Sequence, residues 1–331
     1  MFVSNLGCPH RCVFCDQRQF SRPMPPGEVE ETVRRFFSYC REPLKRRRLL
    51  AFYGGSFTGI ADALFEDYLD VARELTRQGI VHGVKASIRP DQIDAGMIKR
   101  LVGAGFVELE LGAQSLDDTV LSACRRGHTA GDVIAAAQII KESGLALGIQ
   151  FMPGLPGEDR ASFLSTVDGV CALAPDMVRI YPTLVLEGTA LEERYAKGEY
   201  TPLSLEEAVD RTLYAVVRLE SRGVRVVRMG LPQVDTLRVV AGPVHHSFGS
   251  LVRARGFFQM ARAAVARFGL GVTLRVHPRD VHALIGHGRE NLRRLGFDYC
   301  VDSSVPRACL SVNFSTNNTC LTLWDVIDHI L

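Results

Sequence analysis

Three cysteines lie close together near the start of the chain, at Cys8, Cys12 and Cys15. Their spacing is C-x3-C-x2-C, and an aromatic residue, Phe14, comes directly before the third. Thiolates on so short a loop can bind three irons of a cubane iron–sulfur cluster. Because such clusters are normally held by four cysteines, the fourth iron would keep an open coordination position. An open position on a metal is where a substrate or cosubstrate binds, so the loop predicts a cluster with a chemical role.

Zinc and a disulfide are the other uses that such a loop could have. Structural zinc takes four nitrogen or sulfur ligands. His10 could supply the fourth, although neighbouring ligands on so tight a loop would be strained. An odd number of cysteines, with no secretory signal expected, disfavours a disulfide. We therefore expect a [4Fe–4S] cluster on the three cysteines and keep zinc as the alternative.

Strands that alternate with helices follow the cysteine loop. The strands are expected at residues 2–5, 49–53, 84–88, 106–111, 145–151 and 177–181. Helical patterns separate them, and this alternation predicts a parallel sheet with right-handed crossovers. About six such units fit a partial β/α barrel that is open on one side. The residues that could do chemistry come just after strands, at the carboxyl ends where barrel enzymes build their sites.

The barrel pattern is expected to end near Gly223, after a long helix over residues 205–219. A further helix is expected from about Ser247 to Phe268, followed by short pieces. We predict a first domain over residues 1–223 and a smaller α+β domain over residues 224–331. The last three cysteines, Cys300, Cys309 and Cys320, lack close ligand spacing, and a second metal site there is the less favoured reading.

The composition sets broad limits on partners and location. The chain has 331 residues, is 47% hydrophobic and carries a formal net charge of +2. This charge neither requires nor excludes a nucleic-acid partner. No apolar run approaches the about 20 residues of a membrane span, so we expect a cytoplasmic protein that does not enter a membrane. The densest basic run, from Lys45 to Arg48, is either a solvated turn or a phosphate contact.

The sequence resembles the radical S-adenosylmethionine (SAM) superfamily, whose cysteine spacing it shares. Within that superfamily it is similar to the radical SAM half of the Elongator catalytic subunit and its bacterial relatives. More distantly, it resembles the oxygen-independent coproporphyrinogen oxidases. The matching stretches are residues 8–17, 52–58, 89–91, 112–115, 126–129, 152–157, 179–189 and 241–249. The resemblance therefore covers nearly the whole chain.

The resemblance implies a fold, cofactors and a partner. The fold is a partial (β/α)6 TIM-like radical SAM barrel. The cofactors are a [4Fe–4S] cluster and SAM, whose amino and carboxylate groups chelate the fourth iron. An electron from the reduced cluster then cleaves SAM to a 5′-deoxyadenosyl radical. A reductant such as a ferredoxin or a flavodoxin is implied as a partner.

Two segments are expected to hold SAM close to the cluster. Gly54 and Gly55, at a strand end, would let a ligand approach the backbone and would free main-chain groups for the SAM ammonium. Ser56 lies next to them. Phe14 would pack over the cluster or near the adenine. The plain alternative for the glycine pair is an ordinary strand-to-helix turn.

Polar residues after later strands complete the expected SAM site. Gln114 and Ser115 could bond the ribose hydroxyls, and Arg126 could pair with the SAM carboxylate through two hydrogen bonds. Gly154, in a glycine-rich loop, would allow flat packing against the adenine. Capping and surface charge are the alternative roles for the polar residues. Glu110 could point into the barrel, either toward a ligand or as a satisfied core residue.

The sequence also departs from the Elongator subunit. That subunit adds an acetyltransferase domain and uses acetyl-CoA to modify the wobble uridine of tRNA. We expect no such domain here, and no basic amino-terminal extension that binds tRNA. Seven residues before Cys8 are few for this family, so the first strand could be clipped. Ile88 stands where relatives tend to carry threonine, which weakens the case for a polar substrate contact there.

Our leading hypothesis is a radical SAM enzyme whose substrate the sequence does not name. A tRNA modification and a small-molecule or porphyrin-like reaction are both open. The alternative is a catalytically silent or zinc-holding protein on the same fold that binds nucleic acid or regulates. Formation of 5′-deoxyadenosine would separate the two hypotheses.

Overall fold

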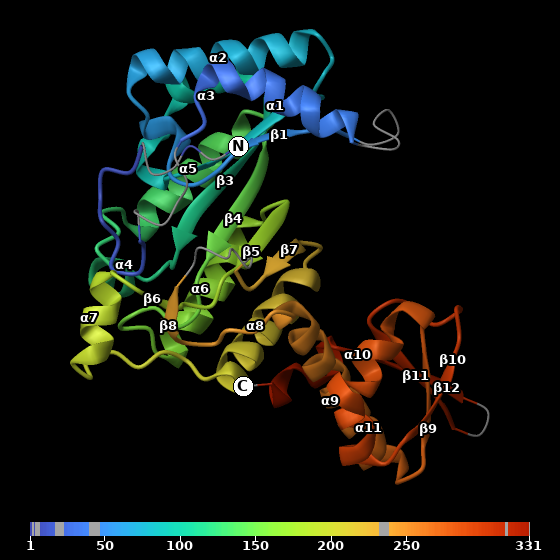
Figure 1. Cartoon of the computed structure of the whole chain (residues 1–331). Coiled ribbons are helices and arrows are strands. Elements are labelled where there is room, and N and C mark those ends of the chain that lie inside the picture. Colours follow the sequence, from blue (N-terminus) through green and yellow to red (C-terminus); the bar gives the residue numbers. More distant parts are fainter. Residues whose placement is uncertain are drawn as a thin grey trace.

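A curved sheet of six parallel strands forms the body of the protein (Figure 1). The computed structural model describes residues 1, 3, 7–16, 23–39, 47–231, 238–314 and 317–330. In spatial order the strands are β1 (Leu50–Phe52), β2 (Val84–Ile88), β3 (Phe106–Gln114), β4 (Ala146–Phe151), β5 (Met177–Ile180) and β7 (Arg225–Met229). This open half-barrel confirms the expected fold class.

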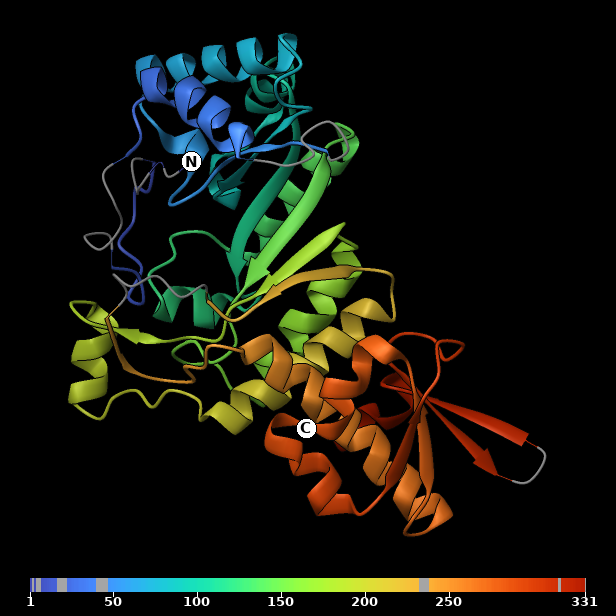
Figure 2. The same cartoon turned by 45° about the vertical axis from the view of Figure 1, so that its right-hand side comes forward.

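Helices cover the outer face of the half-barrel, while the cysteine loop lies on its inner side (Figure 2). The helices of this layer are α1 (Pro26–Ser38), α2 (Asp62–Arg77), α3 (Ala95–Gly103), α5 (Ala130–Glu142), α6 (Arg160–Leu173) and α8 (Leu205–Glu220). The short helices α4 (Asp118–Ala123) and α7 (Ala190–Ala196) lie near the cysteine loop instead (Figure 1). Alternate residues of each strand face this layer, as the fully buried Leu109 and Leu111 of β3 do. Charged neighbours such as Glu108 and Glu110 therefore occupy the inner face.

The sheet has six strands, as expected, but one of them, β7, was not among those expected. The barrel sheet continues past Gly223, because β7 pairs in parallel with β5 and extends the sheet to Met229. The segment expected as a first strand, residues 2–5, lies largely outside the described residues. Of that region, Met1 and Val3 lie beside β1, where the Val3 N–H donates to the Tyr53 carbonyl (2.8 Å).

A smaller α+β unit follows the barrel, as expected. It contains α9 (Phe248–Phe268), α10 (Val281–Ile285), α11 (Glu290–Leu295), β9 (Thr273–Val276), β10 (Asp298–Val301), β11 (Cys309–Phe314) and β12 (Asn317–Thr322). Its sheet has the order β10-β9-β11-β12 and its own apolar core. Helix α9 joins the two parts, because Val252 packs in the barrel core and Met260 in the second core. A division of the chain after residue 223 stays a prediction.

A two-stranded antiparallel ribbon, β6 (Val185–Leu186) with β8 (Val239–Ala241), lies beside the barrel. Short 3-10 turns complete the fold: η2 (Phe57–Gly59), η3 (Pro90–Gln92), η4 (Pro278–Asp280), η5 (His287–Arg289) and η6 (Trp324–His329). Among the described helices, none combines the length and the apolar composition that a bilayer crossing requires.

Candidate active site

The cysteine loop begins against the turn that follows β1. The main-chain N–H of Ser56 donates a hydrogen bond to the Cys8 sulfur. The side-chain N–H of Gln92 donates to the Gly7 carbonyl (3.1 Å), while its amide oxygen accepts from the Ser56 hydroxyl. A Cβ atom on Gly7 would overlap the Ser56 carbonyl oxygen, so only glycine fits there. The start of the loop is thus packed directly on the glycine–serine turn.

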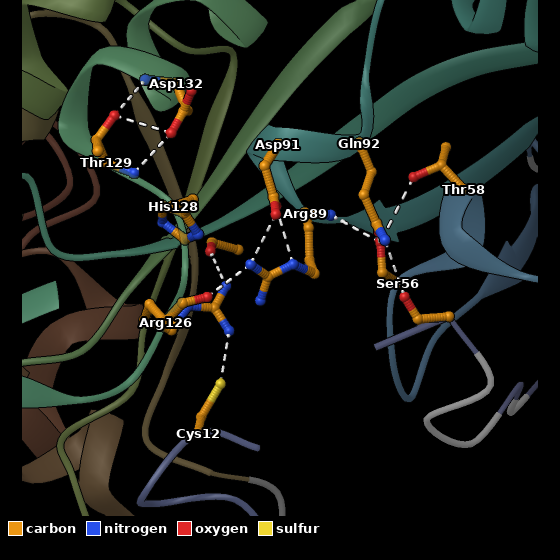
Figure 3. Close-up of polar contacts among 12 residues, drawn as sticks. Cys12, Ser56, Thr58, Arg89, Asp91, Gln92, Arg126, His128, Thr129 and Asp132 are labelled. Carbon is orange, nitrogen blue, oxygen red and sulfur yellow. Dashed lines mark hydrogen bonds and ion pairs between the residues drawn. The ribbon is translucent and has the colours of Figure 1, made fainter. Parts of the chain in front are cut away.

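Arg126 holds the middle of the loop (Figure 3). Its Nη1 atom lies 3.2 Å from the Cys12 sulfur, and its Nη2 atom donates to the Gly112 carbonyl (2.6 Å). The Arg126 carbonyl in turn accepts from Arg89, which makes a bidentate ion pair with Asp91. The carboxyl ends of β2 and β3 are therefore connected to Cys12 through two arginines.

The end of α4 and the start of α7 fix the rest of the loop. Gly127 has a φ of +71°, and a Cβ atom there would overlap the His10 ring. The Val13 N–H donates to the Cys124 carbonyl (3.1 Å), and the Val13 carbonyl accepts from the Leu191 N–H (2.8 Å). The loop is thus held at several points by segments far away in the sequence.

Burial dominates the electrostatics of the thiols. It raises the pKa of Cys8, against the hydrogen bond from Ser56. Burial, followed by the neighbouring Cys12 and Cys8 sulfurs, raises the pKa of Cys15 to about 12. The positive charge of Arg126 lowers both pKa values. Metal ligation needs thiolates, so a cluster at this site would depend on such cations and on the irons themselves.

Two buried polar atoms beside the loop lack a partner among the described residues. They are Nδ1 of His128 and Nε of Arg126. Burial, and then the Arg126 charge, lowers the pKa of His128 to about 4, so its ring is neutral at physiological pH. Its Nε2 atom lies 3.2 Å from the Ala113 carbonyl, which makes that nitrogen the donor and leaves Nδ1 as an acceptor. Buried polar groups are nearly always paired, so a bound polar group would complete this part of the site.

The described side chains do not form a ready-made site for a zinc ion. Zinc needs its ligands to converge on one point, and no three His, Cys, Asp or Glu side chains do so within the described residues. A cubane instead takes each cysteine on a different iron, which suits Cys8, Cys12 and Cys15 on one loop. All three are free thiols, and each of Cys8 and Cys15 interacts electrostatically with Cys12.

The two serines expected to face SAM are bonded within the protein. The Ser56 hydroxyl is buried and accepts from the Arg89 N–H (3.0 Å), in addition to its bond with Gln92. The Ser115 hydroxyl is fully buried, 3.1 Å from the Thr166 hydroxyl, and accepts from the Asp117 N–H. In this conformation both hydroxyls hold the neighbouring backbone in place. A ligand at these two positions could therefore bond only to main-chain groups.

Gln114 and the expected glycines have mixed surroundings. Gln114 is buried at the end of β3 with a φ of +69°, and its side-chain oxygen accepts from Gln150 (3.2 Å). Gly54 has a φ of +105° and, like Gly55 beside it, is half-buried. A Cβ atom on Gly154 would lie 2.8 Å from Leu203, so this glycine packs on a side chain of the protein itself.

The remaining members of the expected site lie at its wall. Phe14 is half-buried and packs on a small apolar cluster under the loop that includes Met152 and Tyr181. The carbonyl of Gly154 accepts from the Tyr200 hydroxyl (2.6 Å). The structure thus brings Phe14, Gly54 to Ser56, Gln114 and Arg126 to the carboxyl edge of the sheet around the cysteines.

A charged network on the inner face of the barrel was largely missed from the sequence. Arg179 lies at its centre and donates to Glu110 (2.6 Å), Tyr181 (3.1 Å) and Tyr53 (3.0 Å). Lys85 lies near the Tyr53 ring and pairs with Glu108 (3.0 Å). The sequence did contain a signal for this network, because charged residues alternate with apolar ones along the strands and so fall on one face. Glu110 does point into the barrel, where Arg179 satisfies it.

The described part of the basic run, Arg47 and Arg48, precedes β1. Lys45 and Arg46 lie outside the described residues. Arg48 stacks over Phe37 and donates to the Gly79 carbonyl (2.8 Å). Because Arg48 precedes β1 while Ser56 follows it, these two residues lie at opposite ends of the strand.

The late cysteines split into a pair and a single residue. Cys309 and Cys320 are diagonal neighbours on β11 and β12, where Cys309 lies opposite Thr322 and Cys320 opposite Ser311, and a hydrogen bond joins the two thiols. Cys300 lies on β10, and β9 and β11 separate it from Cys320. The described residues therefore give no support for a second metal site there.

Comparison with known families identifies the class. The model of the Radical SAM superfamily matches residues 3–169, about half of the chain, and that of the Radical_SAM C-terminal domain matches residues 175–256. The chain belongs to the radical SAM superfamily. Crystallised SuiB of Streptococcus suis, bound to S-adenosylmethionine, shares the fold at 14% identity, with a TM-score of 0.51 over 69% of this chain and 49% of that one.

Nearer relatives confirm the expected branch of the superfamily. The chain is 40% identical over 250 residues to the tRNA uridine(34) acetyltransferase of Methanocaldococcus jannaschii, covering 63% of this chain and 46% of that protein. It is 32% identical over 180 residues to human Elongator complex protein 3, covering 52% and 32%. The structure of an N-terminally truncated Elp3 of Methanocaldococcus infernus has 29% identity and a TM-score of 0.58, covering 69% and 57%. The chain spans about half the length of the curated relatives it matches first.

Proposed function

We propose that this protein is a radical SAM enzyme that holds a [4Fe–4S] cluster through Cys8, Cys12 and Cys15. The observation that carries the proposal is the anchoring of these cysteines at the carboxyl edge of the barrel, where Ser56 bonds Cys8 and Arg126 bonds Cys12. When bound and reduced, the cluster supplies the electron that cleaves SAM to a 5′-deoxyadenosyl radical and methionine. The electron would come from a donor such as a ferredoxin or a flavodoxin.

The protein itself binds and orients SAM in this proposal. The half-buried backbone at Gly54 and Gly55 offers main-chain groups to the SAM ammonium. Arg126 brings a positive charge beside the cluster, suited to the SAM carboxylate. Gln114 offers its side-chain amide to the ribose, and Phe14 forms an apolar wall. The apolar cluster below the loop would help to exclude water.

A tRNA is the substrate class that the comparisons favour. The relatives are named for chemistry on tRNA uridine, and the inner face of the barrel is lined by donors and acceptors such as Lys85, Glu108 and Gln150. A polar lining suits a nucleoside better than an apolar substrate, because buried polar groups need partners. We therefore propose a tRNA uridine as the site of reaction and leave the product to experiment.

Anaerobic reconstitution with iron and sulfide tests the proposal in two steps. In the first, iron per chain and 5′-deoxyadenosine are measured with SAM and a chemical reductant, and both should be found. A full cluster without any 5′-deoxyadenosine would overturn the enzyme proposal in favour of the catalytically silent alternative. In the second step, unmodified tRNA is added and its nucleosides are analysed by mass spectrometry. An active enzyme that leaves every tRNA nucleoside unchanged and binds no tRNA would overturn only the substrate class.

A further inference from the structure

A basic groove runs where the barrel meets the C-terminal unit. A cavity of about 490 Å³ lies between the start of α9, α10 and η5, and four arginines line it: Arg253, Arg279, Arg289 and Arg307. Histidines His282 and His287 lie on the same wall. Helix α10 packs beside α9, which in turn contacts β7 of the barrel sheet (Figure 1). We call this cavity and its neighbour, described next, the basic groove.

The neighbouring cavity extends the groove toward the barrel. It has a volume of about 350 Å³ and shares His245, Ser247, Ser250 and Arg253 with the first. Its far wall is made by Arg228 and Met229, at the carboxyl end of β7. In a parallel sheet this is the edge at which the cysteine loop also lies. The groove therefore leads from the C-terminal unit to the mouth of the half-barrel.

The groove carries an excess of positive charge. Its one acidic lining residue, Asp280, is buried and bound by Arg307 (2.7 Å) and by the Ala308 N–H (2.9 Å), so this charge is already neutralised. Within the described part of the chain, no ion pair is found for Arg253, Arg279 or Arg289. Glu220 lies near enough to attract Arg253 but does not line either cavity. Three exposed guanidinium groups are thus available to a ligand.

Helix α9 adds to this field. It is 21 residues long, has no acidic residue in its first turn, and its first residues Phe248 to Ser250 line the groove. The partial positive charge at a helix N-terminus favours anions, so it reinforces the arginines. Guanidinium groups recognise phosphate oxygens through paired hydrogen bonds.

We propose that the basic groove binds the phosphate backbone of the substrate RNA and so presents one nucleotide to the half-barrel. A single phosphate would need one cluster of donors. Here the arginines are spread along two joined cavities from Arg228 to Arg289, which suits consecutive phosphates. The inference rests on the proposed function, because it takes RNA as the substrate. It also assigns a role to residues after 256, which neither family model covers.

Salt-dependent binding of an unmodified tRNA transcript tests the groove. The test variant is Arg253→Gln/Arg279→Gln/Arg289→Gln in the full chain, reconstituted anaerobically. The control variant is Arg225→Gln/Arg262→Gln/Arg267→Gln, which removes the same charge from exposed arginines outside both cavities. Circular dichroism, the thermal midpoint and iron per chain verify that both variants fold. Dissociation constants are measured by filter binding from low to moderate salt.

The groove variant should bind tRNA about tenfold or more weakly at low salt, because glutamine cannot replace the charge that guanidinium groups bring to phosphates. Its log–log salt slope should flatten by roughly one per lost phosphate contact, and therefore by up to about three. The control variant should stay close to wild type. Equal losses in both variants, or none in either, would overturn the groove while leaving tRNA as substrate. Duplex DNA of similar length that displaces tRNA equally well would overturn the assignment to RNA. Wild type that binds no tRNA, yet forms 5′-deoxyadenosine, would overturn this inference and the tRNA substrate but not the radical SAM activity.

Discussion

The Nη1 atom of Arg126 lies 3.2 Å from the Sγ atom of Cys12, although 114 positions separate the two residues in the chain. The same guanidinium also holds the Gly112 carbonyl at the end of β3. Arg126 therefore sets the position of the cysteine loop relative to the sheet. This contact also places a positive charge beside the sulfur that, in the proposed function, would bind iron as a thiolate.

Arg126→Gln should therefore weaken retention of the cluster. The charged hydrogen bond to Cys12 contributes ~1.5–3 kcal/mol, so iron release to a chelator should be roughly tenfold to a hundredfold faster. Arg125→Gln is the matched control, because Arg125 is the exposed neighbour. Equal release rates in wild type and Arg126→Gln would mean that the contact does not support the cluster.

Replacing any one of Cys8, Cys12 or Cys15 by Ala should abolish both the cluster and SAM cleavage, because two thiolates cannot hold the cubane. The combined replacement of Cys300, Cys309 and Cys320 by Ala should change neither. The measurements are iron per chain and 5′-deoxyadenosine formed after reconstitution. If the second set of changes halved the iron content, the C-terminal unit would hold a second cluster.

Gly127→Ala should destabilise the loop for two reasons. Its φ of +71° costs a residue with a side chain ~1–2 kcal/mol, and the new Cβ would overlap the His10 ring. Adding His10→Ala should restore the part of the lost stability that comes from the overlap with the His10 ring. Gly131→Ala is the control, since its Cβ would meet only the Thr129 hydroxyl at 3.5 Å. The thermal midpoint of unfolding is measured for wild type, Gly127→Ala, the double variant with His10→Ala, and Gly131→Ala. A Gly127→Ala midpoint equal to that of wild type would contradict the packing argument.

Glu158 should make stability depend on pH. Burial raises its pKa from 4.5 to about 7, against the Gly154 N–H and Arg211. Between these two values the native state binds more protons than the unfolded state, so this contribution to stability falls as the pH rises from about 4.5 to about 7. The shift corresponds to up to about 3 kcal/mol.

The test compares wild type with Glu158→Gln, whose side chain does not titrate. The difference between their thermal midpoints should change across this pH range in the direction just given. Glu206→Gln serves as a control, because Glu206 is an exposed residue in the first turn of α8. A wild-type minus Glu158→Gln difference that stays constant with pH would show that Glu158 titrates normally.

The half-barrel and the cluster cysteines could be predicted from the sequence, because both depend on local spacing. Buried strands such as β4 read as apolar runs, and the cysteines share one short loop. Strand β7 was missed because Arg225, Val227 and Arg228 are exposed, so the strand carries no buried run. Which face of a strand is buried, and which strand lies at the edge, is decided only when the whole sheet has assembled.

The predicted SAM contacts could be placed at the correct edge but not oriented. Ser115 follows a strand, as expected, yet its hydroxyl meets Thr166, 51 positions away. Lys45 to Arg48 are basic in sequence, but Arg48 belongs to the opposite end of the strand. Such partners are chosen by tertiary packing, which composition and spacing do not encode.

The anchoring of Val13 by Leu191 has a consequence for how the protein is made. The cysteine loop leaves the ribosome first, but the segment that completes its support is synthesised about 180 residues later. At about 5–20 residues per second, this interval is on the order of ten seconds or more. During it the three thiols are exposed to oxidants and to stray metal ions. For the proposed cluster, the supported loop would therefore form only after more than half of the chain has been made, and early oxidation of the nascent thiols would compete with iron binding.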